Sequence, residues 1–154
     1  MGKLYVVRHA DAGHRGGPGD PDEARMLSER GQRQAEGLRR AFAEVGITRL
    51  VASPFVRCVQ TLVPLGDELG LRVEVDPRLA EGQGAAGVLA LAKELRDTSA
   101  ALCSHGDVIP DLLDALVASG TKLKDEMRWQ KASTWVFTWD GDQLAKGRYL
   151  PPPG

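Results

Sequence analysis

The chain has 154 residues, of which 42% are hydrophobic and 27% charged, and its formal net charge is −1. This length suits one domain with a buried core, which we place at residues 1–154. The balanced charge argues against a nucleic-acid or membrane surface, and no apolar run approaches the roughly 20 residues of a membrane-spanning helix. We therefore expect a cytoplasmic protein.

The N-terminal part begins with "KLYVV" (3–7), a short run of β-branched and aromatic residues that predicts a buried strand. The segment "AGHRGGPGDPDEA" (12–24) is rich in Gly, Pro and Asp and predicts a loop, long enough to indicate a functional role. From Ser28 onward apolar residues recur at steps of three and four, which predicts a helix that Gly46 closes.

The middle of the chain repeats the step from strand to helix. "RLVAS" (49–53) predicts a second strand, followed directly by a helix with Ser53 as its N-cap and Pro54 in its first position. "LRVEVD" (71–76) alternates apolar and polar residues and predicts a third strand. The sequence therefore indicates strands joined by helical crossovers.

The C-terminal part adds two more helices and three more strands. Residues 84–97 predict a helix, "AALCS" (100–104) a buried strand, and "VIPDLLDALVASG" (108–120) a further helix. Residues 133–150 predict a hairpin that turns at Asp140 and Gly141.

Strands alternating with helices at this spacing predict an α/β fold. We expect a three-layer αβα sandwich with a mostly parallel central sheet and a C-terminal antiparallel hairpin. In such sheets ligands bind beyond the carboxyl ends of the strands. The residues at those ends are the candidates for a site.

Basic side chains follow three of the predicted strands. Arg8 and His9 follow the first, Arg57 lies in the first turn after the second, and His105 follows "AALCS". Arginine forks stabilise the oxygens of a transferring phosphoryl group, and a neutral imidazole can attack phosphorus and hold the group covalently. The constellation therefore predicts phosphate chemistry in which one histidine is the nucleophile and the other binds phosphate.

Three motifs, "VVRHADA", "SPFVRCVQT" and "CSHGD", resemble the signatures of the histidine phosphatase superfamily, the phosphoglycerate mutase-like proteins. The resemblance implies that His9 is the phosphorylated nucleophile and that Arg8, Arg57 and His105 form the phosphate pocket. Ala10 stands where the pattern usually has glycine, as is frequent in the SixA-type branch. The short chain also favours that branch, which acts on phosphohistidine.

Two further stretches refine the resemblance. "ARMLSERGQRQAEGL" (24–38) is similar to the SixA-type Arg-Pro-Leu-Thr stretch and makes Arg25 a candidate third phosphate ligand, with a solvated residue ahead of a helix as the equal alternative. "RCVQTLVPL", "VIPDLL" and "KASTWVF" also resemble the phosphatase domain fused to some bacterial Nudix hydrolases, which indicates a nucleotide-type substrate. No Nudix motif is present.

Two carboxylates compete for the role of proton donor. Glu81 in "PRLAEGQ" stands where the superfamily's Arg-Leu-x-Glu pattern places its general acid, whereas Asp11 is interpreted as a turn residue. His14 and Arg15 either line the mouth of the site or, as we prefer, are solvent-exposed loop residues. Cys103 is interpreted as a reduced, buried strand residue.

The sequence thus predicts a phosphatase that needs no metal and no cofactor, with His9, Glu81 and His105 catalytic and Arg8, Arg25, Arg57 and His105 binding phosphate. Its expected partner is a phosphorylated protein or a small phosphorylated molecule, and not nucleic acid or a membrane. Protein phosphohistidine is the first substrate class and small esters or nucleotide-type phosphates the alternative. A catalytically silent phosphate-binding module is the hypothesis of another class. Oligomeric state stays open.

Overall fold

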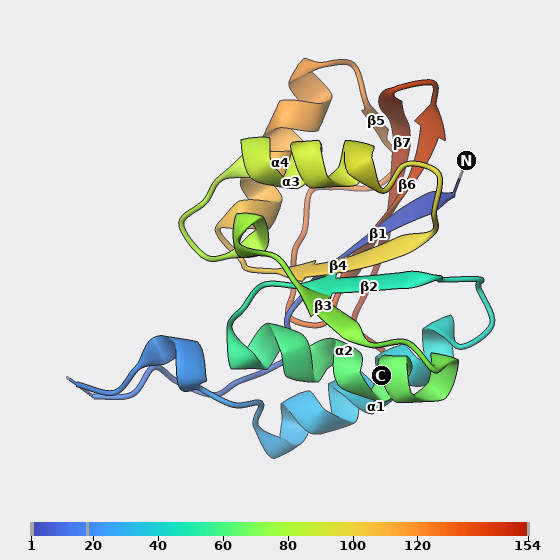
Figure 1. The fold of residues 1–154 in the computed structure, drawn as a ribbon. Helices are drawn as coiled ribbons and strands as arrows, with labels where there is room; N and C mark the ends of the chain where they lie inside the picture. The colour runs from blue at the N-terminus through green and yellow to red at the C-terminus, as the bar shows by residue number, and fades with distance from the viewer. Residues whose placement is uncertain (1, 18, 154) are drawn as a thin grey trace.

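In the computed structural model, which describes residues 2–17 and 19–153, a seven-stranded sheet lies between two layers of helices (Figure 1). This arrangement confirms the predicted αβα sandwich. In chain order the elements are β1 (Lys3–Arg8), the short 3-10 helix η1 (Asp22–Ala24), α1 (Glu29–Phe42), β2 (Arg49–Ala52), α2 (Val56–Leu69), β3 (Val73–Val75), a second 3-10 helix η2 (Pro77–Leu79), α3 (Ala85–Glu94), β4 (Ala100–Ser104), α4 (Val108–Ala118), β5 (Lys122–Leu123), β6 (Thr134–Asp140) and β7 (Gln143–Leu150).

The strand order in the sheet is β3-β2-β4-β1-β6-β7-β5. The four strands β3, β2, β4 and β1 run parallel, and β6 continues the sheet antiparallel to β1. The hairpin of β6 and β7 is antiparallel, as predicted, while the two-residue strand β5, which the sequence did not indicate, pairs parallel with β7. The carboxyl ends of β1, β2 and β4 therefore meet at one edge.

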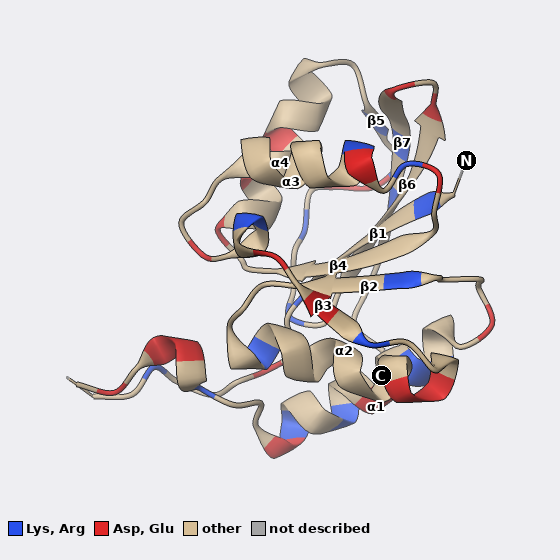
Figure 2. Cartoon of the chain, in the orientation of Figure 1, with Lys and Arg blue, Asp and Glu red and all other residues tan. Residues whose placement is uncertain are grey.

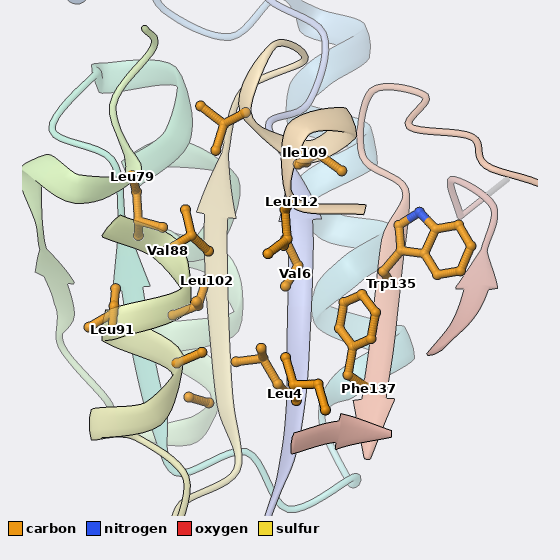
Figure 3. Close-up of a cluster of buried hydrophobic side chains, with 14 of the residues drawn as sticks. Leu4, Val6, Leu79, Val88, Leu91, Leu102, Ile109, Leu112, Trp135 and Phe137 are labelled. Atoms are coloured by element: carbon orange, nitrogen blue, oxygen red, sulfur yellow. The ribbon is translucent and has the colours of Figure 1, made fainter. Parts of the chain in front are cut away.

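Alternation along β1 divides the core between the two helical layers. Leu4 and Val6 face the cluster built with α3 and α4, which Figure 3 shows together with Trp135 and Phe137 of β6. Tyr5 belongs to the opposite cluster, built with α1 and α2. With apolar packing on both faces, β1 is a rigid support for the residues that follow it.

The strand β4 completes this support at the centre of the sheet. All five of its residues are buried, and it carries no charged residue (Figure 2). Its last residue, Ser104, lies in register with Arg8 of β1. The chain therefore leaves both strands at the same level, so the residues after them lie side by side.

Several predicted boundaries were wrong by a few residues. The first long helix ends at Phe42 rather than near Gly46, and the hairpin turns at Gly141 and Asp142, because Asp140 still pairs with Gln143. Within the described ranges, the helices all lack the combination of length and apolar character that crossing a lipid bilayer requires.

The predicted N-cap of α2 was also wrong. The helix begins at Val56, two residues later than predicted, with Phe55 as N-cap. Ser53 lies before the cap, where its hydroxyl accepts from the backbone nitrogen of Phe55 at 3.2 Å and contacts the ring of His105 at 2.9 Å.

Candidate active site

All of the predicted site residues except His105 line a cavity of about 370 Å³ at the carboxyl edge of the parallel strands. It is lined by Arg8, His9, Gly13, His14, Arg15, Arg25, Arg57, Glu81, Gly106, Asp107 and Lys131. A larger cleft, of about 1200 Å³, lies along α1 and the C-terminal prolines but contains none of the predicted site residues. We take the smaller cavity as the site because it collects the buried ionisable groups.

His9 lies directly after β1 and is 5% exposed. Its Nδ1 lies 2.8 Å from the carbonyl oxygen of Ala10, which can only accept, so Nδ1 carries the proton and Nε2 a free lone pair. Burial is the largest cause that lowers the pKa of His9 to about 3, and the positive charges of Arg57 and Arg8 act in the same direction. A neutral imidazole with its outer nitrogen unprotonated has the form that a nucleophile needs.

His105 follows β4, and its ring centroid lies 5.5 Å from that of His9. The ring is 1% exposed, sits edge-on to Phe55, and contacts the Ser53 hydroxyl through Nε2. Its Nδ1 is buried and has no hydrogen-bond partner in the described part of the chain. The structure thus brings the two strand-end histidines together.

The three predicted arginines surround the same cavity. Arg57, in the first turn of α2, is 1% exposed and donates to the carbonyl oxygen of Asp22 at 2.9 Å. Arg8 donates to the carbonyl oxygen of Trp129 at 2.9 Å. Nε of Arg8 and Nε of Arg57 are buried without a partner among residues 2–17 and 19–153. Because buried donors are rarely left unpaired, these atoms mark a position suited to an anion.

Arg25 belongs to the site rather than to a solvated segment. Its Nη1 donates to the carbonyl oxygens of Ala12 and Gly13, and its Nε pairs with Asp22 at 3.2 Å. These bonds hold the loop before α1 against the cavity that Arg25 lines.

Asp22 is a site residue that sequence reasoning missed. Its carboxylate lies 3.0 Å from Arg15, 3.1 Å from Arg57 and 3.2 Å from Arg25. Burial favours the protonated form, but Arg57 and the other guanidinium groups outweigh it, so the pKa of Asp22 is lowered. No signal beyond its place in a polar loop could have found it.

Glu81 lies in the cavity through a salt bridge. Its Oε1 is 2.8 Å from Arg15 and 3.8 Å from Arg57. Arg15 and His14 are solvent-exposed, as we preferred, and they also line the mouth of the cavity. The salt bridge holds the loop that precedes η1 against the segment that carries Glu81.

The competing acid, Asp11, has a different role. Its carboxylate accepts from the Ser28 hydroxyl at 2.5 Å and pairs with Lys131 at 3.1 Å. The bond from Ser28 is the main cause that lowers the pKa of Asp11 to about 2. Ser28 is also the N-cap of α1, accepting from Gly31. Asp11 therefore anchors a helix, in line with its interpretation as a turn residue.

Thr61 of α2 and the glycine after His105 hold residues that line the cavity in place. Thr61 accepts from the backbone of Ala10 and donates to the carbonyl of Arg57, which ties the loop after His9 to the helix. A side chain at Gly106 would lie 2.6 Å from Nη2 of Arg8, so only glycine leaves this guanidinium its position. Cys103 is buried in β4, as expected. Among the residues that the structure describes, no three His, Cys, Asp or Glu side chains gather as metal ligands.

Fold and site together define an α/β protein with an arginine-lined anion pocket around two imidazoles, an arrangement suited to covalent phosphoryl transfer. Residues 4–86 match the family described as the histidine phosphatase superfamily (branch 1). The chain belongs to this family.

Individual relatives add detail. The chain is 35% identical over 155 residues to a protein of Mycolicibacterium smegmatis named 8-oxo-(d)GTP phosphatase, with 97% of this chain and 48% of that protein covered. It is 34% identical over 84 residues to a probable phosphoglycerate mutase GpmB of Erwinia tasmaniensis, covering 53% of this chain and 38% of that protein. The chain thus spans less than half the length of these relatives.

Two solved structures share the fold. The protein histidine phosphatase SixA in complex with tungstate superposes with a TM-score of 0.73 at 24% identity, covering 99% of this chain and 96% of that one. The putative phosphohistidine phosphatase SixA from Agrobacterium tumefaciens gives a TM-score of 0.76 at 21% identity, with 98% of both chains covered.

Proposed function

We propose that the chain is a phosphatase that works through a phosphohistidine on His9 and draws its positive charge from arginine. Two observations support this most. His9 is neutral, with its Nε2 unprotonated. Near it, three buried nitrogen atoms lack a hydrogen-bond partner among the described residues: Nε of Arg8, Nε of Arg57 and Nδ1 of His105. A phosphoryl group supplies the oxygens that such donors need.

In the first step of the proposed reaction, Nε2 of His9 attacks phosphorus, and the bond from phosphorus to the leaving oxygen breaks with its electron pair on that oxygen. Glu81, which lines the cavity, gives the leaving oxygen a proton. Water then attacks the phosphohistidine, the P–N bond breaks, and Glu81 takes the proton from the water. Arginine and His105 hold the phosphoryl oxygens throughout.

The silent binding module predicts binding without turnover, so the first test is turnover of p-nitrophenyl phosphate by the full chain. An acid-labile, alkali-stable phosphoryl label should appear in a quenched reaction and map to His9. Activity should persist in EDTA and be inhibited by vanadate. Binding of vanadate with no turnover would support the silent module, and a label on any residue other than His9 would refute the mechanism.

For the substrate, we place nucleotide-type phosphates ahead of protein phosphohistidine, the reverse of the order from sequence alone. The match of 97% of this chain to 48% of an 8-oxo-(d)GTP phosphatase supports this order, as does a carboxylic acid in the cavity. An alkoxide is a basic leaving group that needs a proton, and a placed acid contributes roughly 10² to 10⁴ in rate. The leaving imidazole of phosphohistidine depends less on one.

Protein phosphohistidine stays the second candidate because Arg25, from the stretch that resembles the SixA-type branch, lines the cavity. The variant Glu81→Gln separates the two classes. It should slow hydrolysis of alkyl phosphates and nucleoside monophosphates, whose leaving group is an alkoxide, most, that of p-nitrophenyl phosphate less, and that of phosphohistidine least. Glu23→Gln, a change at an exposed carboxylate in η1, is the matched control. Equal losses on all substrates would show that Glu81 only shapes the cavity.

A further inference from the structure

The contact between Ser53 and His105 has no role in the proposed reaction. Ser53 follows β2 directly, is fully buried, and is fixed by a bond from its backbone nitrogen to the carbonyl oxygen of Cys103 at 3.0 Å. Its hydroxyl oxygen lies 2.9 Å from Nε2 of His105. Ser53 is the first residue of the motif "SPFVRCVQT", but neither the roles that the resemblance implies nor the proposed reaction uses it.

The direction of this hydrogen bond follows from the other partners of the hydroxyl. Ser53 Oγ accepts from the backbone nitrogen of Phe55 at 3.2 Å. In the part of the chain that the structure describes, His105 Nε2 is the one acceptor in contact with the hydroxyl hydrogen. If Nε2 carried a proton, the hydroxyl hydrogen of a fully buried serine would have no acceptor, which is unfavourable by about 1–3 kcal/mol. The hydroxyl therefore donates to Nε2.

The neighbouring thiol fits the same assignment. Cys58 Sγ lies 3.6 Å from His105 Nε2 and 3.8 Å from the carbonyl oxygen of Ser104. A carbonyl oxygen repels a thiolate and accepts from a thiol, so the S–H of Cys58 points to Ser104. With Cys58 as a thiol, no group around Nε2 requires a proton from the ring. Burial raises the pKa of Cys58, but contacts with Cys103 and His105 lower it to about 6, so the assignment applies to the thiol form.

We propose that Ser53 is a positioning residue that fixes neutral His105 as the tautomer with its proton on Nδ1, the buried nitrogen that lacks a protein partner. The proposal rests on the function assigned above and adds to it. Both imidazoles are held with the proton on Nδ1, His9 by the Ala10 carbonyl and His105 by the Ser53 hydroxyl, but they offer different nitrogens to the phosphoryl group. His9 presents a lone pair to phosphorus, and His105 presents an N–H to a phosphoryl oxygen.

The wrong tautomer of His105 would harm the reaction. A lone pair on Nδ1 repels the oxygens of a phosphoryl group, whose charge the pocket must stabilise. Loss of one buried hydrogen bond of ordinary strength shifts a tautomer equilibrium by up to about tenfold. We therefore expect Ser53→Ala to populate both tautomers and, since only the form with its proton on Nδ1 supports turnover, to lower kcat for p-nitrophenyl phosphate about twofold.

The tautomer is read directly from long-range ¹H–¹⁵N spectra of the full-length, ¹⁵N-labelled protein, with His105 assigned from the variant His105→Asn. In the wild type, Nδ1 of His105 should be protonated, and Ser53→Ala should give a mixture. Ser53→Thr keeps the hydroxyl and should restore both the spectrum and kcat. Ser119→Ala, at the end of α4, is the matched control and should change neither.

Three results would overturn the proposal: a proton on Nε2 in the wild type, an unchanged tautomer in Ser53→Ala, or a tautomer shift in Cys58→Ala with none in Ser53→Ala. These spectra need no substrate, so they are interpretable even if the wild type fails to turn over p-nitrophenyl phosphate. That failure would count against the phosphatase function and leave the tautomer assignment standing.

Discussion

Replacing His9 by asparagine should make the protein less sensitive to acid, because His9 is a buried histidine held neutral. Its pKa is lowered from 6.5 to about 3, first by burial and then by nearby positive charge. Above pH 6.5 the folded and unfolded chains both carry a neutral imidazole, so the shift has no effect there. As the pH drops from 6.5 to about 3, the unfolded chain takes up a proton that the folded chain does not, and the free energy of unfolding decreases.

The size of this loss follows from the two pKa values. At one pKa unit per 1.36 kcal/mol, His9 lowers the free energy of unfolding by about 2 kcal/mol at pH 5 and about 3 kcal/mol at pH 4. In His9→Asn this loss is absent. Between pH 7 and pH 5 the free energy of unfolding should therefore decrease by about 2 kcal/mol more in the wild type than in His9→Asn.

Urea unfolding followed by the fluorescence of the three tryptophans measures this difference at each pH. Any packing defect of the variant is a constant offset, and carboxylates such as Asp11 titrate in both proteins and cancel. His14→Asn removes an exposed imidazole and is the matched control. Parallel stability curves for wild type and His9→Asn across pH 7 to 5 would refute the reasoning that His9 is neutral through burial.

Three further substitutions test the geometry of the cavity. Arg57→Lys should lower kcat/KM for p-nitrophenyl phosphate by about 10²-fold or more, since a point charge does not replace a fork; the exposed Arg39→Lys is its control. Gly106→Ala should reduce kcat while changing the unfolding free energy by less than about 1 kcal/mol, because its Cβ displaces the end of Arg8. Gly31→Ala should destabilise by about 1–3 kcal/mol, opposite to helix propensity, because its Cβ would collide with the carbonyl oxygen of Asp11; a more stable variant would contradict that contact.

The fold could be predicted because its signals are local. Apolar runs at period two and at steps of three and four gave the main strands and helices, and the order of strand and helix gave the parallel sheet. The start of α2 was predicted two residues too early, and the contact of Ser53 with His105, 52 residues away in sequence, could not be predicted. Strand β5 has only two residues and depends on pairing with β7.

Some site residues could be predicted from the sequence, and others depend on contacts that only the folded chain makes. Arg8, His9, Arg57 and His105 stand at strand ends, so the topology alone brings them to one edge of the sheet. Asp22 is 35 residues from Arg57 in a loop with no periodic pattern, and its role depends on contacts that only the folded chain makes. Arg15 and His14 are exposed, as expected, and the sequence left open that they also lie at the cavity mouth, since exposure and that position are compatible.

The Asp22 carboxylate gives the buried Arg57 an internal counterion within the fold. A phosphate dianion that enters the cavity therefore exchanges with an anion that the protein itself carries, instead of displacing salt ions from an open cationic surface. Affinity should then depend only weakly on ionic strength, because few mobile ions are released. Singly charged anions such as chloride, which offer Arg57 no more charge than Asp22 already does, should compete poorly for the cavity.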